Sequence, residues 1–242
     1  MLEIKGLVKS YGSKEVLHGI DLEVRDGEIF GFIGPNGAGK STTLKCLSGI
    51  LPFEKGDIKI GGYDILTNPM EAKRITAYLP DNPDIYENLT GIQFLNFVGD
   101  VFNVPSDVRT QRINDLSREL EIYENLGDQV SSYSHGMKQK LALISAFLHE
   151  PKFLVLDEPF VGLDPKAAFI LKQKMKQLCE RGSSVLFSSH VLEVVEKLCD
   201  RVGIMVAGEF RQIGATEEII ADQSLEQVFL ELDKNETPLE TH

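Results

Sequence analysis

One segment of the chain combines glycines, a lysine and hydroxyl residues at a spacing that suits phosphate binding. Residues 34–41 fit the pattern G-x-x-x-x-G-K-[S/T]. Glycines let the backbone curl until successive N–H groups point at phosphate oxygens. Lys40 is expected to reach the outer phosphates of a nucleotide, and the Ser41 hydroxyl to bind the Mg²⁺ that bridges them. The predicted contacts are Gly34, Pro35, Asn36, Gly37, Ala38, Gly39, Lys40, Ser41 and Thr42.

Two adjacent carboxylates form the second candidate for chemistry. Asp157 and Glu158 follow directly after the short apolar run at residues 153–156, which suits a central parallel strand. A carboxylate at such a strand end holds Mg²⁺ in phosphate-loop proteins, often through water, and Asp157 suits that role. Glu158 suits a general base or a group that positions the attacking water.

The elements that must position these residues alternate between strands and helices, which favours an α/β fold. Residues 2–28 read as short strands and turns, with Ile20, Leu22 and Val24 alternating with charged residues. Further strands are expected at 28–33, 57–65, 153–156 and 184–187, and helices at 41–50, 88–120, 137–148, 167–179 and 191–198. The phosphate-binding segment therefore lies between a strand and a helix, where a helix N-terminus favours an anion.

Composition narrows the class of protein. The 242 residues are 42% apolar, which is enough for a substantial core. The formal net charge of -12 and the scattered basic residues argue against nucleic acid as the main partner. Cys46, Cys179 and Cys199 show no metal-ligand spacing and are expected to be free thiols. No stretch approaches the roughly 18 apolar residues of a membrane helix, so we expect a soluble chain that can dock to a membrane protein.

Three more segments carry a family resemblance. Residues 133–137, Tyr-Ser-His-Gly-Met, begin an expected helix 23 residues before Asp157 (157 − 134), and residues 162–165 read Gly-Leu-Asp-Pro. His190 follows the strand at 184–187. With the phosphate loop, these segments resemble the nucleotide-binding subunit of ATP-binding cassette (ABC) transporters over nearly the whole chain. Residues 133–137 depart from the family signature Leu-Ser-Gly-Gly-Gln at three positions.

The resemblance implies a fold and a division of the chain. It implies a phosphate-loop NTPase core, RecA-like and with a mainly parallel sheet, joined to an antiparallel β subdomain and an α-helical signature subdomain. One ATP-binding domain would span residues 1–242. Within it, the core and β subdomain would occupy about 1–85 and 149–225, the helical subdomain 86–148, and a C-terminal helix and tail 226–242. The polar end, residues 235–242, is expected to fray.

The resemblance also implies roles for single residues. Tyr11 would stack on adenine, with Val16 beside it. Ser134 and the Gly136 backbone would bind the γ-phosphate held by a second copy of the domain, because a helix begins there. His190 would hydrogen-bond the γ-phosphate and orient the water together with Glu158.

Asp81 departs from the family, which usually has glutamine at this position. The side chain is one methylene shorter, about 1.5 Å of reach, and it carries a charge. Asp81 either binds Mg²⁺ as a hard anionic ligand or is a loop carboxylate without contact to the metal. We favour the first interpretation.

The function implied by the resemblance is ATP hydrolysis coupled to transport, with ATP and Mg²⁺ bound. The implied partners are a second ATP-binding subunit, identical in a homodimer, and a separately encoded transmembrane permease, which places the chain in the cytoplasm on the inner face of the cell membrane. The variant motifs and the ending at residues 224–229 look most like bacterial export-type ATPases for drugs, peptides or lipid-like substrates. The alternative is an ABC ATPase without transport that acts on nucleic acid or the ribosome. A GTPase is disfavoured because no Asn-Lys-x-Asp segment is present.

Overall fold

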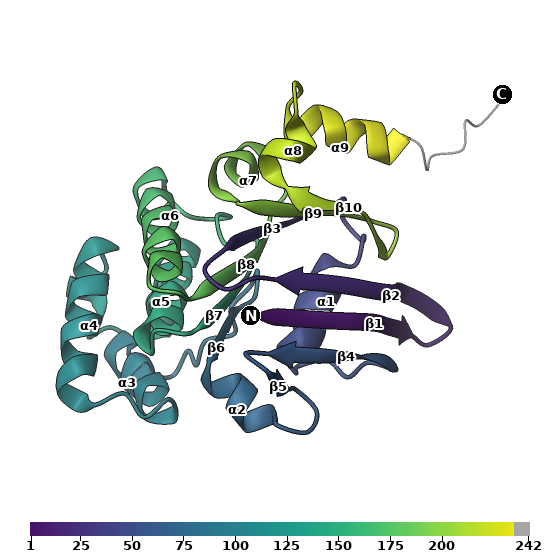
Figure 1. Cartoon of the computed structure of the whole chain (residues 1–242). Coiled ribbons are helices and arrows are strands. Elements are labelled where there is room, and N and C mark those ends of the chain that lie inside the picture. Colours follow the sequence, from purple (N-terminus) through teal and green to yellow (C-terminus); the bar gives the residue numbers. More distant parts are fainter. Residues whose placement is uncertain (235–242) are drawn as a thin grey trace.

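A computed structural model describes residues 1–234, so the expected frayed tail at 235–242 lies outside the described residues. Two sheets and the helices around them make up the fold (Figure 1). The strands are β1 (Leu2–Tyr11), β2 (Lys14–Val24), β3 (Ile29–Ile33), β4 (Lys55–Ile60), β5 (Tyr63–Asp64), β6 (Thr76–Leu79), β7 (Phe153–Asp157), β8 (Ser184–Ser188), β9 (Arg201–Val206) and β10 (Glu209–Ala215). The helices are α1 (Lys40–Leu47), α2 (Pro69–Arg74), α3 (Gly91–Val101), α4 (Ser106–Glu119), α5 (His135–Leu148), α6 (Pro165–Glu180), α7 (Leu192–Leu198), α8 (Thr216–Ile220) and α9 (Leu225–Lys234), with 3-10 turns at Tyr123–Asn125 and Val130–Ser132.

The larger sheet has the strand order β10-β9-β3-β8-β7-β6. The pairs from β9 to β6 are parallel, and β10 is antiparallel to β9. The smaller sheet has the order β2-β1-β4-β5 and is antiparallel throughout. The expected fold, a mainly parallel core sheet with an antiparallel β subdomain and a helical part, is confirmed.

The central strands are apolar on both faces because both faces are covered. Every residue of β3, β7 and β8 is buried, as is typical of a parallel sheet between two layers. One face packs with α1 and the antiparallel sheet, and the other packs with α5, α6 and α7. The carboxyl ends of these parallel strands meet at one edge of the sheet, which brings Gly34, Asp157 and Ser188 into the same region.

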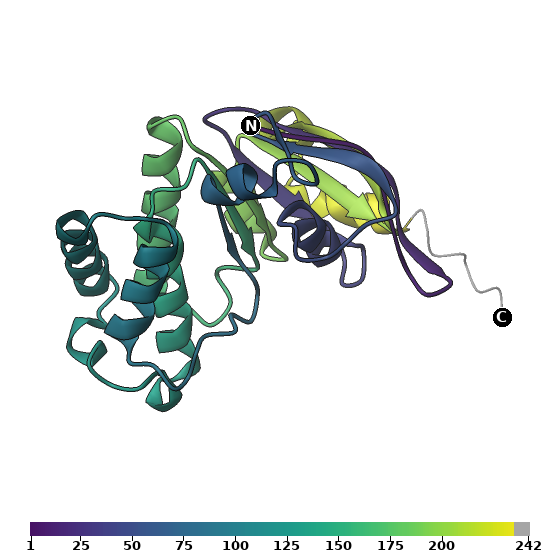
Figure 2. The same cartoon turned by 90° about the horizontal axis from the view of Figure 1, so that it is seen from below.

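Residues 86–148, which we call the helical lobe, contain α3, α4 and α5. Helices α3 and α4 extend away from the two sheets, while α5 also packs against the larger sheet (Figures 1 and 2). The sequence predicted one helical stretch at 88–120, but the structure divides it. Thr90 and Gln93 form a capping box that begins α3. Asn103 then takes a left-handed φ of 54°, and Pro105, the N-cap of α4, cannot continue a helix because it lacks the N–H. These two residues end the first helix and start the second.

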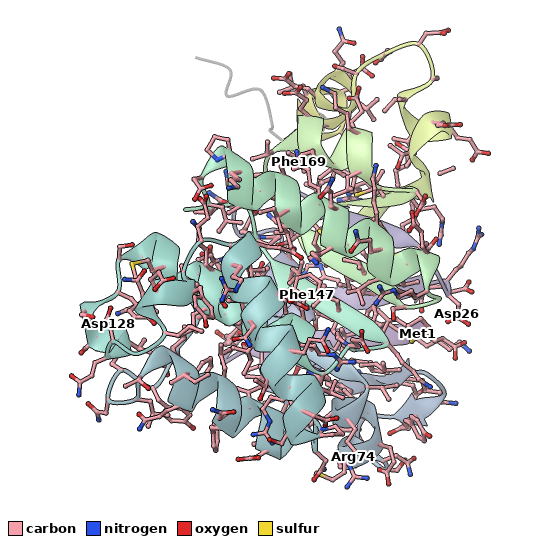
Figure 3. The ribbon with its side chains drawn as sticks, turned by 90° about the vertical axis from the view of Figure 1, so that its left-hand side faces the viewer. Met1, Asp26, Arg74, Asp128, Phe147 and Phe169 are labelled. Carbon is pink, nitrogen blue, oxygen red and sulfur yellow. The ribbon has the colours of Figure 1, made fainter. Side chains whose placement is uncertain are left out.

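The C-terminal helix α9 packs against the core. Leu225 is fully buried, and Val228, Phe229 and Leu232 pack against the same core cluster. The Leu225 backbone N–H donates to Glu196 Oε2 over 2.9 Å, which ties α9 to α7. Figure 3 shows the molecule from the side of α4, with Phe147 of α5 and the exposed Phe169 of α6 labelled.

His149, directly after α5, makes the stability of the fold sensitive to acid. Its ring is stacked on Phe102 with 3.7 Å between centroids. Burial lowers the pKa of His149 from 6.5 to about 4; the Thr76 backbone opposes this shift and the Arg112 charge assists it. The unfolded chain therefore binds more protons than the folded one between these values. The resulting stability is complete above pH 6.5 and is lost as the pH falls to 4.

We expect the free energy of unfolding to fall by about 2.5 kcal/mol between pH 7 and pH 4.5 because of this one group. In His149→Gln, which does not titrate, the decrease over this pH interval should be smaller by that amount. Chemical denaturation of both proteins at the two pH values measures the difference. An equal pH dependence in parent and variant would contradict the assignment to His149.

Candidate functional site

The phosphate loop lies between β3 and α1 and is closely packed from beneath. A β-carbon added at Gly34 would lie 2.3 Å from the Met205 carbonyl oxygen, so a side chain there would require the backbone to move. Gly39 has a φ of 111°, and its added β-carbon would lie 2.6 Å from Leu17 Cδ2. Gly34 requires glycine because β9 lies against it. Gly39 requires glycine because Leu17 lies against it and because its backbone has a positive φ.

Lys40 begins α1 and turns its ammonium group back over the loop. Its Nζ donates to the carbonyl oxygens of Gly34 over 2.6 Å and Pro35 over 3.1 Å. Burial lowers the pKa of Lys40, and the charges of Glu158 and Asp157 oppose this shift. The loop thus presents a buried cation whose present partners are neutral carbonyls, a favourable position for an anionic phosphate.

A cavity of about 390 Å³ opens above the loop. It brings together most of the residues that the sequence singled out, including Asp81 and Glu158 from distant segments. Its lining residues are Lys14, Val16, Asn36, Gly37, Gly39, Lys40, Ser41, Thr42, Asp81 and Glu158. Lys14 was not anticipated, because a single basic residue after a Gly-Ser turn matches no motif.

Ser188 holds the Asp157 carboxylate and the Glu158 backbone at the end of β7. Its hydroxyl donates to Asp157 Oδ1 over 2.6 Å and accepts from the Glu158 N–H over 2.9 Å. Asp157 and Ser188 face each other in the parallel register, and Asp157 is 3% exposed. The sequence did not single out Ser188. Its place at the end of a strand beside the Asp157 strand is the signal that would have found it.

Glu158 and His190 form a pair at the rim of the cavity. His190 Nδ1 lies 2.8 Å from Glu158 Oε2, and the His190 backbone N–H donates to the same oxygen over 3.2 Å. The Glu158 backbone has a left-handed φ of 49°, a conformation that costs free energy in a residue other than glycine and is concentrated at functional sites. The side chain of Glu158 is 15% exposed, against 59% for His190, so the base candidate is held in place and still faces the cavity.

Tyr11, Ser134 and Gly136 lie outside the lining of this cavity. Tyr11 ends β1 with an exposed ring, and Lys9 Nζ lies 5.5 Å from the ring centroid. Ser134 is the exposed N-cap of α5 and accepts from the Met137 N–H over 3.3 Å. Within one chain, the structure therefore does not bring the signature residues to the phosphate loop.

The start of α5 packs against the loop at residues 162–165. A β-carbon added at Gly136 would lie 3.2 Å from the Gly162 carbonyl oxygen, so these two backbones are close. Lys140 Nζ pairs with Asp164 Oδ2 over 2.6 Å, and Asp164 also caps α6 by accepting from the Ala167 N–H. The hydrogen bond to Lys140 is the main cause that lowers the pKa of Asp164. The signature helix and the segment that follows Glu158 are thus joined in the same chain.

The donors around the cavity suit Mg²⁺ bound together with a nucleotide. Ser41 and Asp81 line the cavity, and Asp157 directly precedes the lining residue Glu158. Their hydroxyl and carboxylate oxygens are hard donors, which Mg²⁺ prefers. In residues 1–234, no group of three or more His, Cys, Asp and Glu residues converges as a metal site. Mg²⁺ normally takes only one or two carboxylates and completes its shell with phosphate oxygens and water. The residues present therefore fit this ion.

Comparison with known proteins agrees with this geometry. Residues 17–161 match the family model described as ABC transporter. The chain is 36% identical over 219 residues to the linearmycin resistance ATP-binding protein LnrL of Bacillus subtilis, covering 90% of this chain and 70% of LnrL. It is 33% identical over 241 residues to the ABC-type transporter ATP-binding protein EcsA of the same organism, covering 98% of both.

Two solved structures share the fold. An ATP-binding subunit of an ABC transporter superposes with a TM-score of 0.92 and 34% identity, covering 96% of this chain and 99% of that chain. The ATP-binding cassette MJ0796, a dimer in a post-hydrolysis state bound to ADP and Pi, superposes with a TM-score of 0.82 and 20% identity, covering 89% and 99%. No helix among residues 1–234 has the length and apolar character to cross a membrane. This chain belongs to the ABC transporter family as an ATP-binding subunit, and it is an ATPase.

Proposed function

We propose that two identical copies of this chain close head to tail over two ATP molecules and that this motion powers a transporter. The observation that carries the proposal is the separation of the site residues within one chain. The cavity holds the phosphate loop, Asp81 and Glu158, while the exposed Ser134 and the neighbouring Gly136 lie outside it. A second copy that places its Ser134 over the first copy's loop would complete the site.

Within each site, the residues of one chain would divide the work. The loop N–H groups and Lys40 bind the phosphates, and Ser41, Asp157 and Asp81 hold Mg²⁺, which supplies positive charge against the charge developing on the phosphoryl group. Glu158 polarises the attacking water, and His190 holds its carboxylate. Tyr11 and Val16 bind the base, with the exposed ring of Tyr11 stacking on adenine. Closure excludes bulk water from these charges and strengthens their interactions.

The helical lobe, assigned to residues 86–148, would carry the dock for a membrane-spanning subunit. Phe94 is buried, but Phe97 is 45% exposed and its ring meets the exposed ring of Tyr86 edge-on, with 5.6 Å between centroids. Val101 on the same helix is also exposed. Exposed apolar groups of this kind mark interaction sites. The group of Tyr86, Phe97 and Val101 lies in the segment that follows Asp81 along the chain.

The transported substance would be a drug, a peptide or a lipid-like compound, and the direction would be export. The name of the relative LnrL links it to resistance against linearmycin, and removal of a toxic compound from the cell is one route to resistance. The chain would then act on the inner face of the cell membrane.

Outside the helical lobe, the chain would form the nucleotide-binding core and β subdomain, at about 1–85 and 149–225, and the C-terminal segment 226–242.

Co-purification tests the transport function. The tagged chain, isolated from detergent-solubilised membranes of its own cells, is expected to carry an integral membrane protein with several spanning segments. Phe97→Ser should lose this protein because a hydroxyl replaces the exposed ring of the dock, while the unfolding temperature of the isolated chain stays near that of the parent. Recovery with ribosomes or nucleic acid in place of a membrane protein would contradict the proposal.

A further inference from the structure

Tyr78 carries a buried hydroxyl that the fold does not use. Tyr78 lies on β6, and its ring packs with the core cluster between the large sheet and α1. The hydroxyl oxygen is buried and has no hydrogen-bond partner among the described residues. A buried polar group without a partner costs free energy, commonly about 1–3 kcal/mol, and such groups are rare in folded proteins. A phenylalanine would fill the same space without this cost.

The position of Tyr78 places it beside the metal-binding candidates. Tyr78 pairs with Val155 in the parallel register of β6 and β7, and Asp157 lies two residues further along β7. Because side chains alternate along a strand, Tyr78, Val155 and Asp157 lie on the same face of the sheet. Asp81 follows three residues after Tyr78, where the chain leaves β6 and forms part of the cavity wall.

The charges around the hydroxyl determine how it can act. Burial is the main cause that raises the pKa of Tyr78 above its ordinary value, and the carboxylates of Asp157 and Asp81 raise it further. The hydroxyl therefore keeps its proton and is available as a donor in a region rich in acceptors. Asp157 already receives one hydrogen bond, from Ser188 to Oδ1. A second donor on this side would help to fix the orientation of its carboxylate.

We infer that Tyr78 is a positioning residue of the magnesium site, whose hydroxyl joins the hydrogen-bond network of waters and carboxylates that forms around the metal at Asp157. This inference rests on the proposed function, because it requires Mg²⁺ to bind there with the nucleotide. Partners around a metal ligand orient it and tune affinity. Binding of Mg²⁺-nucleotide would thus give this hydroxyl the partner that no described side chain or backbone group supplies.

Tyr78→Phe separates this role from a structural one. Without nucleotide, the variant is expected to unfold at the same temperature as the parent or higher, because it loses an unsatisfied group. With saturating ADP, Mg²⁺ is titrated and the unfolding temperature is recorded. In Tyr78→Phe, the Mg²⁺ concentration that gives half of the rise in unfolding temperature should be about fivefold higher than in the parent, which is the effect of one hydrogen bond. ADP in the presence of EDTA should stabilise both proteins equally.

Tyr133→Phe is the matched control. Its buried hydroxyl donates to the Asn125 carbonyl oxygen over 2.5 Å within the helical lobe, so its loss should lower the unfolding temperature and leave the Mg²⁺ midpoint unchanged. Asp157→Asn serves as the positive control and should raise the midpoint more than Tyr78→Phe. An unchanged midpoint in Tyr78→Phe, with a normal rise in the parent, overturns this inference alone. Absence of any Mg²⁺-dependent rise in the parent overturns the proposed magnesium site as well.

Discussion

Glu158→Gln is expected to lower ATP turnover on the order of 1,000-fold, within the range attributed to a positioned general base. The amide has the same shape as the carboxylate but cannot polarise the attacking water. Binding of ATP should remain because the phosphate loop and Lys40 are intact. Since hydrolysis no longer reopens the closed pair, the variant should accumulate as an ATP-bound dimer. Phosphate release and gel filtration with Mg²⁺ and ATP measure the two effects.

Glu217→Gln provides the control, since Glu217 is an exposed carboxyl on α8. This variant should hydrolyse ATP at the parent rate and elute like the parent. Turnover at the parent rate in Glu158→Gln would remove Glu158 from the chemistry. A variant that is inactive but stays monomeric with ATP would retain the role of Glu158 and contradict closure of two copies.

Ser134→Asp is expected to lower ATP turnover strongly without destabilising the folded chain. Aspartate is as good an N-cap as serine and suits the positive end of α5, so the unfolding temperature should be unchanged or higher. Its charge, however, would face the γ-phosphate bound by the second copy. Repulsion between the aspartate carboxylate and the γ-phosphate is enough to lower turnover on the order of 100-fold. Phosphate release measures turnover, and calorimetry measures ATP binding to the single chain, which should stay normal.

Ser134→Asn is the matched control for charge. Asparagine has the shape of aspartate and caps helices equally well, but it does not repel phosphate. Its turnover should lie between those of the parent and Ser134→Asp. If Ser134→Asp hydrolyses ATP normally, Ser134 is only a helix cap and the composite site is wrong. If Ser134→Asp loses ATP binding in the single chain, the residue acts within its own chain instead.

The sequence was sufficient for the core of the fold because its signals there are local and strong. The buried runs of β3 and β7 are short and apolar, and they are followed by a glycine and by an acidic residue, so their arrangement with the carboxyl ends at one edge of a sheet could be predicted. The phosphate loop has a motif whose spacing is imposed by its geometry. Ser134 was predicted as a helix start, and the structure shows its capping hydrogen bond.

Other features could not be predicted because they depend on contacts between distant segments. The role of Lys14 depends on which elements lie beside the loop, and no pattern around this residue shows it. The role of Ser188 depends on the pairing of β7 with β8, which places it opposite Asp157. The Tyr78 hydroxyl lacks a partner only because of how β6 packs against its neighbours. The break after α3 was missed because apolar spacing continues through it, while the turn is imposed by Asn103 and Pro105.

Asp81 illustrates a position where sequence and structure each supply half of the answer. The departure from glutamine was visible in the sequence. Choosing between a metal ligand and a loop carboxylate, however, required the position of Asp81 relative to the phosphate loop. The structure places Asp81 on the wall of the cavity with Ser41 and Glu158. This location supports the role of a metal ligand proposed above, and Asp81→Ala in the Mg²⁺ titration would measure its contribution.

The position of the helical lobe in the chain determines which part of the fold can vary without affecting the sheet. The lobe occupies the connection between β6 and β7, which are parallel neighbours in the sheet. Parallel neighbours need a long crossover in any case, and its length and content are free to vary without disturbing strand pairing. With the dock proposed for this lobe, a change in the crossover would alter recognition of the membrane-spanning subunit while the pairing of β6 with β7 stays the same.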